Sequence, residues 1–136
     1  MIKYKTIKKL PPARLYELYE SVSWTKGIKN KKKHGLLISK VYNGSSAVFS
    51  AWNKETLIGI VRVISDNLTH AYIVGLVVDS KYEKQGIAKE LIQRCAKKYS
   101  KMRINVETNE STNGLYKKTG FKKSPTINLF MGDYVI

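Results

Sequence analysis

The sequence of 136 residues is poor in cysteine, histidine, arginine and acidic side chains. Its single cysteine, Cys95, excludes an internal disulfide and any metal site built from several cysteines. A chain without disulfides suits a reducing compartment, so we expect a cytoplasmic protein. No apolar run approaches the roughly 20 residues that a membrane span needs. No apolar segment with a cleavage site follows the basic N-terminus, so we expect neither a membrane partner nor a secretory signal.

The scarcity of acidic residues leaves a strong positive charge. Ten Asp and Glu stand against 25 Lys and Arg, which gives a formal net charge of +15. Nucleic-acid binders show such a charge, but it would attract any anionic ligand. The cations are mostly lysine, whereas arginine is the usual reader of bases. The arginines are Arg14, Arg62, Arg94 and Arg103. Charge therefore leaves a nucleic acid and an anionic cofactor or substrate as alternative partners.

Apolar residues make up 43% of the chain, enough for a single domain over residues 1–136. Their periodicity predicts helices over residues 13–23, 35–42, 87–99 and 111–119. The strands are predicted over residues 4–9, 47–53, 56–65, 70–78, 102–108, 121–123 and 127–134. The strand over 70–78 is nearly all apolar, so we expect burial on both of its faces. Since a helix separates 70–78 from 102–108, these strands should run parallel, which makes the fold α+β with a mixed sheet.

Residues 77–91 join the end of a strand to the start of an amphipathic helix through a polar turn. The turn holds Gln85-Gly86-Ile87-Ala88, where small residues allow a ligand to approach the backbone. A helix that begins there presents free N–H groups and the positive end of its dipole. This geometry predicts a site for phosphate or pyrophosphate.

Several common motifs are absent from this turn and from the rest of the chain. The turn lacks the Gly-Lys-Ser/Thr ending of a P-loop, and one glycine is too few for a dinucleotide fingerprint. His34 and His70 lie far apart, and no His-Glu-x-x-His or similar metal spacing occurs. No Gly-x-Ser-x-Gly elbow is present. These absences argue against NTPases, dehydrogenases, metallohydrolases and serine hydrolases, and we expect no metal.

Two segments together resemble the GCN5-related N-acetyltransferases, the GNAT superfamily. LVVDSKYEKQGIAKELI resembles motif A, whose loop Gln/Arg-x-x-Gly-x-Gly/Ala falls on residues 83–88. NESTNGLYKKTGF, residues 109–121, resembles motif B. The matching residues of motif B are Asn109, Leu115, Tyr116, Gly120 and Phe121. Three positions depart from the pattern: Glu83 replaces Gln or Arg, Lys84 a common Gly, and Thr112 a frequent Ala. An acid at position 83 should repel pyrophosphate, and Lys84 would offset it.

The resemblance implies a small single-domain GNAT fold whose parallel strands splay apart around the pantetheine arm of acetyl-CoA. The residues that it implies in the binding of acetyl-CoA are Leu76, Val77, Val78, Glu83, Lys84, Gln85, Gly86, Ile87, Ala88, Lys89, Asn109 and Tyr116. The N–H of Val78 would polarise the thioester carbonyl, and the N–H groups of residues 85–89 would hold the pyrophosphate. Asn109 would hydrogen-bond the pantetheine arm. Tyr116 would act as the general acid on the departing thiolate.

The implied reaction is direct attack by a primary amine of a small molecule or protein in a ternary complex. The resemblance does not identify the general base that would deprotonate the amine. Glu107 is a candidate because it stands at a strand end, and Asp66 and His70 are further candidates. An amine that is already unprotonated in solution needs no base. The acceptor pocket would form around residues 24–38, and a homodimer would use the terminal strands. Two alternatives remain. One is a basic nucleic-acid-binding module with this fold and no catalysis; the other is an acetyltransferase for an amine borne by a ribosomal protein or RNA.

Overall fold

A mixed five-stranded sheet forms the centre of the computed structural model, which describes residues 1–133. The strands are β1 (Ile2–Lys5), β2 (Ala47–Asn53), β3 (Thr56–Ser65), β4 (His70–Val78) and β5 (Arg103–Val106). Their spatial order is the same as their order in the chain. The pairs β1–β2, β2–β3 and β3–β4 are antiparallel, whereas β5 runs parallel to β4. The prediction of an α+β fold with a mixed sheet is therefore confirmed.

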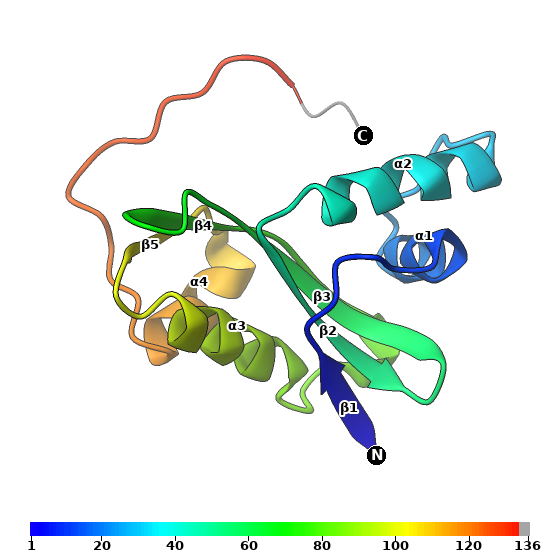
Figure 1. Ribbon diagram of the computed structural model, residues 1–136, viewed down its shortest axis with the longest axis horizontal. Helices are drawn as coiled ribbons and strands as arrows, with labels where there is room; N and C mark the ends of the chain where they lie inside the picture. The colour runs from blue at the N-terminus through cyan, green and yellow to red at the C-terminus, as the bar shows by residue number, and fades with distance from the viewer. Residues whose placement is uncertain (134–136) are drawn as a thin grey trace.

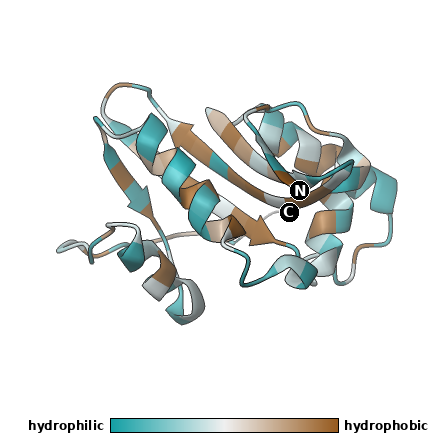
Figure 2. Cartoon of the chain, turned by 90° about the horizontal axis from the view of Figure 1, so that it is seen from below, coloured by the Kyte–Doolittle hydropathy of each residue, from teal (hydrophilic) through white to brown (hydrophobic). Residues whose placement is uncertain are grey.

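Helices cover both faces of this sheet (Figure 1). The helices α1 (Pro12–Ser21) and α2 (Lys31–Asn43) lie over one face, and α3 (Ile87–Lys98) lies over the other. A short 3-10 turn, η1 (Ser80–Tyr82), precedes α3, and α4 (Glu110–Lys118) follows β5. Figure 2 shows the apolar residues gathered on the strands and on the helix surfaces turned toward them. The sheet thus separates two apolar cores.

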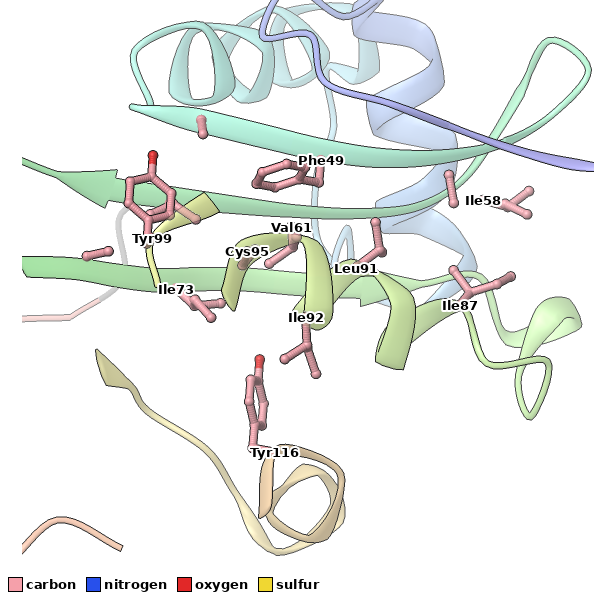
Figure 3. Packing of buried hydrophobic residues seen from close by; sticks show 14 residues of the cluster. Phe49, Ile58, Val61, Ile73, Ile87, Leu91, Ile92, Cys95, Tyr99 and Tyr116 are labelled. Carbon is pink, nitrogen blue, oxygen red and sulfur yellow. The ribbon is translucent and has the colours of Figure 1, made fainter. Parts of the chain in front are cut away.

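The core beneath α3 explains why this helix forms where the periodicity predicts it. Leu91, Ile92 and Cys95 are fully buried against the sheet (Figure 3). The helix crosses β3 at Gly59, where an added Cβ would lie 3.0 Å from Cγ2 of Ile87. A side chain at position 59 would push α3 off the sheet. Because α3 is held this closely, its N-terminus is fixed relative to the end of β4.

Some predicted boundaries were wrong. The first strand covers residues 2–5 rather than 4–9, because the chain leaves the sheet after Lys5 so that Leu10 can pack into the core beneath α1 and α2. The second helix begins at Lys31 rather than at residue 35, since the Asn30 side chain accepts a hydrogen bond from the N–H of Lys33 and caps it. Lys31, Lys32 and Lys33 therefore form the first turn of this helix.

The prediction that residues 70–78 are buried on both faces was also wrong. Ala71, Ile73 and Val77 are buried, but Tyr72 is 37% exposed and residues 74–76 are half-buried. For residues 74–76 the cause is the short partner strand, since β5 pairs with β4 only over residues 70–73. The second half of β4 therefore borders open space rather than another strand.

The predicted terminal strand pair is absent from residues 121–133, and Tyr134 lies outside the described residues. This segment leaves the domain after α4 as an extended chain (Figure 1). Its apolar side chains Ile127, Leu129, Phe130 and Met131 are between 86% and 99% exposed. Strand propensity records how well side chains fit a pleated, half-buried surface. No such surface lies beneath residues 127–131, so their alternation is not enough to form a strand.

Candidate active site

The parallel strands β4 and β5 separate halfway along β4. Their pairing runs from His70↔Arg103 to Ile73↔Val106, where β5 ends. The strand β4 continues for five more residues to Val78 without this partner. A gap between two parallel strands exposes backbone groups that a ligand can pair with. The parting of β4 from β5 is therefore the structural centre of the candidate site.

A β-bulge shapes β4 at the point where the two strands separate. The register against β3 passes from Ile60↔Val77 to Arg62↔Val74, so two residues of β4 lie opposite one residue of β3. One of them is Gly75, whose φ of +69° favours glycine. Bulges of this kind bend a strand and occur often beside active sites. The glycine inside an otherwise apolar run was the sequence signal for this bulge.

The end of β4 turns one backbone N–H toward the gap. The N–H of Asp79 donates to the carbonyl of Ile58 over 2.8 Å, and Val78 lies opposite Gly59 in the antiparallel register. Hydrogen-bonded and non-hydrogen-bonded pairs alternate along such a ladder. The N–H of Val78 therefore points away from β3, toward the side on which β5 has departed. This direction is the one that a donor to a substrate carbonyl needs.

The start of α3 is an uncapped helix N-terminus. Gly86 is the N-cap residue, with φ +79°, and no side chain accepts a hydrogen bond from the first turn. In contrast, the N-caps of α2 and α4 are asparagines whose side chains accept such bonds. An added Cβ at Gly86 would meet nothing within 4 Å, so the space in front of the turn is open. Residues 83–86 are exposed, which leaves the side chains of Glu83 and Lys84 at the rim of this turn.

A cavity of about 920 Å³ lies at the gap between β4 and β5. It gathers residues from the helices α1, α2 and α4 and from the strands β3, β4 and β5. Its lining consists of Tyr19, Trp24, Ile38, Val41, Arg62, Tyr72, Ile73, Val74, Gly75, Leu76, Val106, Glu107, Thr108, Asn109, Thr112 and Tyr116. Of the residues that the resemblance assigned, the structure brings Leu76, Glu107, Asn109 and Tyr116 into this one cavity. Val78 and the turn 83–89 lie outside the lining, further along the chain from the end of β4.

Asn109 is held by the cap that it makes for α4. Its side-chain oxygen accepts hydrogen bonds from the N–H of Thr112 at 3.1 Å and from the hydroxyls of Ser111 and Thr112. The N–H of Asn109 donates in return to Oγ1 of Thr112, which completes a capping box. Thr112, a departure from the family pattern, thus has a structural role here. The cap uses the side-chain oxygen and not the amide nitrogen of Asn109, which itself lines the cavity.

Tyr116 stands on α4 beneath α3. Its ring packs edge-to-face on Phe121, with centroids 5.4 Å apart, and the side chain is only 4% exposed. Figure 3 shows the ring rising from α4 with its hydroxyl directed toward Ile92. Burial raises the pKa of Tyr116 to about 12, with a smaller contribution from Cys95. The hydroxyl is therefore protonated at neutral pH and able to donate.

The three candidate bases are separated by the structure. Glu107 lines the cavity, and its carboxylate accepts a hydrogen bond from the hydroxyl of Tyr72 over 3.3 Å. Asp66 caps the turn between β3 and β4, where it accepts bonds from the N–H groups of Leu68 and Thr69. A hydrogen bond from the Thr69 hydroxyl, together with those backbone bonds, lowers the pKa of Asp66. His70 stands at the far end of β4, and neither it nor Asp66 belongs to the lining.

The thiol of Cys95 plays no part in the cavity. Cys95 is fully buried in the core beneath α3, and burial raises the pKa of its thiol to about 12, so it is inert. Residues 1–133 contain no group of three or more His, Cys, Asp or Glu side chains placed to hold a metal ion. Within the same residues, no helix is long and apolar enough to cross a membrane.

Comparison with known proteins identifies a family and a fold. A family model for the acetyltransferase (GNAT) domain matches residues 18–130. The structure of a GNAT-family acetyltransferase from Streptococcus pneumoniae superposes with a TM-score of 0.75 at 19% identity, covering 98% of this chain and 100% of that one. Among curated proteins there is no match.

Two further solved structures show the same fold with a ligand named. A predicted acetyltransferase from Clostridium acetobutylicum with acetyl-CoA has a TM-score of 0.70 at 16% identity, covering 96% of each chain. An aminoglycoside acetyltransferase from an uncultured soil metagenomic sample, in complex with sisomicin, also has a TM-score of 0.70, at 20% identity. That match covers 98% of this chain and 96% of the other.

Proposed function

Because this chain belongs to the GNAT family of acetyltransferases, we propose that it moves an acetyl group from acetyl-CoA to a primary amine. The observation that carries this proposal is the parting of β4 from β5 over a cavity lined by Asn109 and Tyr116. The similar structures named for acetyl-CoA and for the aminoglycoside sisomicin support the donor and an amine acceptor. In this proposal residues 1–136 act as a single domain.

The residues at the gap suit acetyl-CoA. The uncapped N-terminus of α3 offers the N–H groups of residues 85–89 to the pyrophosphate, where the helix dipole also favours negative charge. The open edge of β4 at Leu76–Val78 offers main-chain groups to the pantetheine arm. Asn109 adds its amide nitrogen from the opposite wall. Glu83 is the one charge in this set that opposes the ligand.

Acetyl-CoA supplies the acetyl group as a reactive thioester. As the amine nitrogen bonds to the carbonyl carbon, negative charge gathers on the carbonyl oxygen, and the N–H of Val78 is directed to stabilise it. The bond between carbon and sulfur then breaks, and the electron pair leaves with sulfur. An amine that binds in its protonated form must lose one proton before it attacks, and Glu107, which lines the cavity, is the proposed acceptor of this first proton, either directly or through water.

Tyr116 donates its hydrogen bond to the departing sulfur. With a pKa of about 12, the phenol is a weaker acid than a thiol, whose ordinary pKa is about 8.5. Complete transfer of its proton is therefore uphill unless the phenol oxygen receives another proton at the same time. The second proton, which the nitrogen loses after it has bonded to carbon, serves this purpose. We thus assign Tyr116 as a hydrogen-bond donor to the leaving group that passes a proton only in concert with nitrogen.

Two measurements on the purified protein test the proposal. Acetyl-CoA at a hundred times its Kd should stabilise the fold by about 2.7 kcal/mol, which raises Tm by several degrees. Free thiol should then appear when primary amines are added. Absence of any stabilisation at saturating acetyl-CoA would refute the proposal. If the protein does not bind acetyl-CoA but binds RNA in a salt-sensitive manner, the nucleic-acid-binding module would be favoured instead.

A further inference from the structure

The cavity at the gap contains one cation and one anion. Among its sixteen lining residues, Arg62 and Glu107 are the two that carry a formal charge at neutral pH. Arg62 comes from β3, and Glu107 follows the end of β5. The ion pairs formed among residues 1–133 are Arg14–Glu17, Lys31–Glu20 and Arg94–Glu90. Within the described chain, therefore, neither cavity charge is neutralised by a counter-ion.

Arg62 is an unusual residue for its position. It interrupts the apolar run of β3 and is half-buried, and its Nη1 donates one long hydrogen bond, 3.4 Å, to the hydroxyl of Ser45. A guanidinium carries five N–H donors, and a partly buried charge without a partner is costly. The remaining donors of Arg62 have no acceptor among residues 1–133. These donors are therefore available to water or to an anionic ligand in the cavity.

Two tyrosines lie near the guanidinium at the cavity wall. The hydroxyls of Tyr19 and Tyr42 hydrogen-bond each other over 2.9 Å; burial raises the pKa of both, and the nearby charge of Arg62 partly offsets this rise. The bulge residue Gly75 is close to the same group, since an added Cβ there would lie 4.0 Å from Nε of Arg62. The phenols, the bulge and Ser45 thus surround a cation beside the gap.

The position of Arg62 separates it from the proposed acetyl-CoA site. Arg62 pairs with Val74, four residues before the N–H of Val78 along β4. It also lies on the side of the sheet where Tyr19 of α1 and Tyr42 of α2 pack, whereas α3 covers the other side. The cation therefore lies in the part of the cavity lined by Tyr19 and Trp24, on the side where the amine acceptor would bind. The rings of Tyr19 and Trp24 pack edge-to-face with centroids 5.1 Å apart.

We propose that the amine acceptor of this enzyme also carries an anionic group, a carboxylate or a phosphate, and that Arg62 binds it. The planar guanidinium matches either group with two parallel hydrogen bonds. The amine then lies toward Glu107, and Tyr19 and Trp24 border the carbon skeleton. The net charge of +15 favours the approach of an anionic acceptor over that of a polycation. This inference rests on the proposed acetyl transfer and specifies its substrate class.

Matched pairs of amines test the inference by thiol release. One pair is 4-aminobutyrate with 4-aminobutyramide, a second is L-methionine with L-methioninamide, and a third is glucosamine 6-phosphate with glucosamine. At least one acid-bearing amine should be acetylated with a kcat/KM between about ten- and a hundredfold above its neutral partner. The first two pairs report a carboxylate, and the third reports a phosphate.

Variants then assign the preference to Arg62. Arg62→Gln should raise KM for the preferred acid by about tenfold or more, leave KM for its neutral partner within about threefold, and leave the Kd of acetyl-CoA unchanged. Arg62→Lys keeps the positive charge but loses the two parallel N–H donors, so its KM for the preferred acid should lie between those of the wild-type protein and Arg62→Gln. Arg103→Gln, which removes a cation from the exposed face of β5, is the matched control and should change neither KM. Should Arg62→Gln fail to fold, Arg62→Lys and the preference of the wild-type protein decide the question.

Three outcomes overturn the inference while acetyl-CoA still binds. They are a preference for neutral amines, an equal effect of Arg62→Gln on both members of a pair, and the absence of acetylation of every acid-bearing amine. If acetyl-CoA neither binds nor releases thiol, the proposed function fails and this inference falls with it. Binding of acetyl-CoA therefore distinguishes the two failures.

Discussion

At the scale of single residues, Tyr116 shows how burial selects a protonation state. We predict that Tyr116→Phe lowers kcat by about a hundredfold and leaves the Kd of acetyl-CoA within about threefold, because only the hydrogen bond to the leaving sulfur is lost. Its hydroxyl makes no hydrogen bond with residues 1–133, so Tm should not fall. Steady-state kinetics and thermal unfolding measure these effects.

Tyr99 provides the control for that substitution. It is 2% exposed, and its hydroxyl has no partner in the described part of the chain, but it does not line the cavity. Tyr99→Phe should keep full turnover, because it removes a buried hydroxyl outside the site. Undiminished turnover by Tyr116→Phe, or an equal loss in both variants, would rule out the role assigned to Tyr116.

Glu83 is the residue in the proposed pyrophosphate site whose charge opposes the ligand. It is exposed and forms no ion pair within residues 1–133, so nothing described there neutralises it. We predict that Glu83→Gln tightens acetyl-CoA binding about two- to fivefold, the modest effect expected of an exposed charge. Isothermal titration at low salt measures it. Glu55→Gln, in the hairpin between β2 and β3, should leave Kd unchanged; a similar gain there would indicate net charge rather than position.

At the scale of elements, α4 connects stability to the site through its cap. We predict that Asn109→Ala lowers the free energy of unfolding by about 1 kcal/mol. The substitution should also weaken acetyl-CoA binding, since the amide of Asn109 is lost, and reduce kcat, since the first turn of α4 sets the position of Tyr116. Asn30→Ala removes the equivalent cap of α2, and it should cost similar stability while leaving the Kd of acetyl-CoA unaffected. A loss of acetyl-CoA affinity in both variants would mean that general instability, not the cap of α4, is responsible.

The elements also show which features a sequence can predict. The strands at residues 47–53, 56–65 and 70–78 were predicted with their observed bounds, because each pairs with a neighbour in the chain and alternation records that pairing. The segment at 127–133 alternates as well, but a strand there would need a partner distant in sequence, and none forms in the described residues. Local pattern predicts a strand only where the fold brings a partner to it.

Some residues of the candidate site could likewise be predicted from the sequence, whereas others could not. Motif spacing pointed to Asn109, Tyr116 and the turn before α3, which lie in two short stretches of the chain. Arg62, Tyr72 and Gly75 line the cavity together with Asn109 and Tyr116, but they come from β3 and β4, and in the sequence they are only a cation, an aromatic residue and a glycine within apolar runs. Their convergence depends on the bulge in β4 and on the early end of β5, which are properties of the folded sheet.

At the scale of the whole molecule, buried phenols and the buried thiol couple stability to alkaline pH. Burial raises the pKa of Cys95 from 9.0 to about 12 and the pKa of Tyr116 from 10.0 to about 12. The folded state therefore retains protons that the unfolded state releases, so this stability is present below pH 9 and is lost as pH rises toward 12. We predict a flat free energy of unfolding from pH 7 to 9 and a decline above it, measured by urea titration. In Cys95→Ala the decline should begin about one pH unit higher; an identical onset would contradict the assignment.

The central claim is that acetyl-CoA binds where β4 leaves β5 and where α3 begins. Amide chemical shifts of the isotope-labelled protein during titration with acetyl-CoA test it most directly. The largest changes should fall on Val78, on residues 85–89 and on Asn109, with little change in β1 or the first turn of α2. An unchanged spectrum at millimolar acetyl-CoA, or changes confined to other parts of the molecule, would contradict the claim.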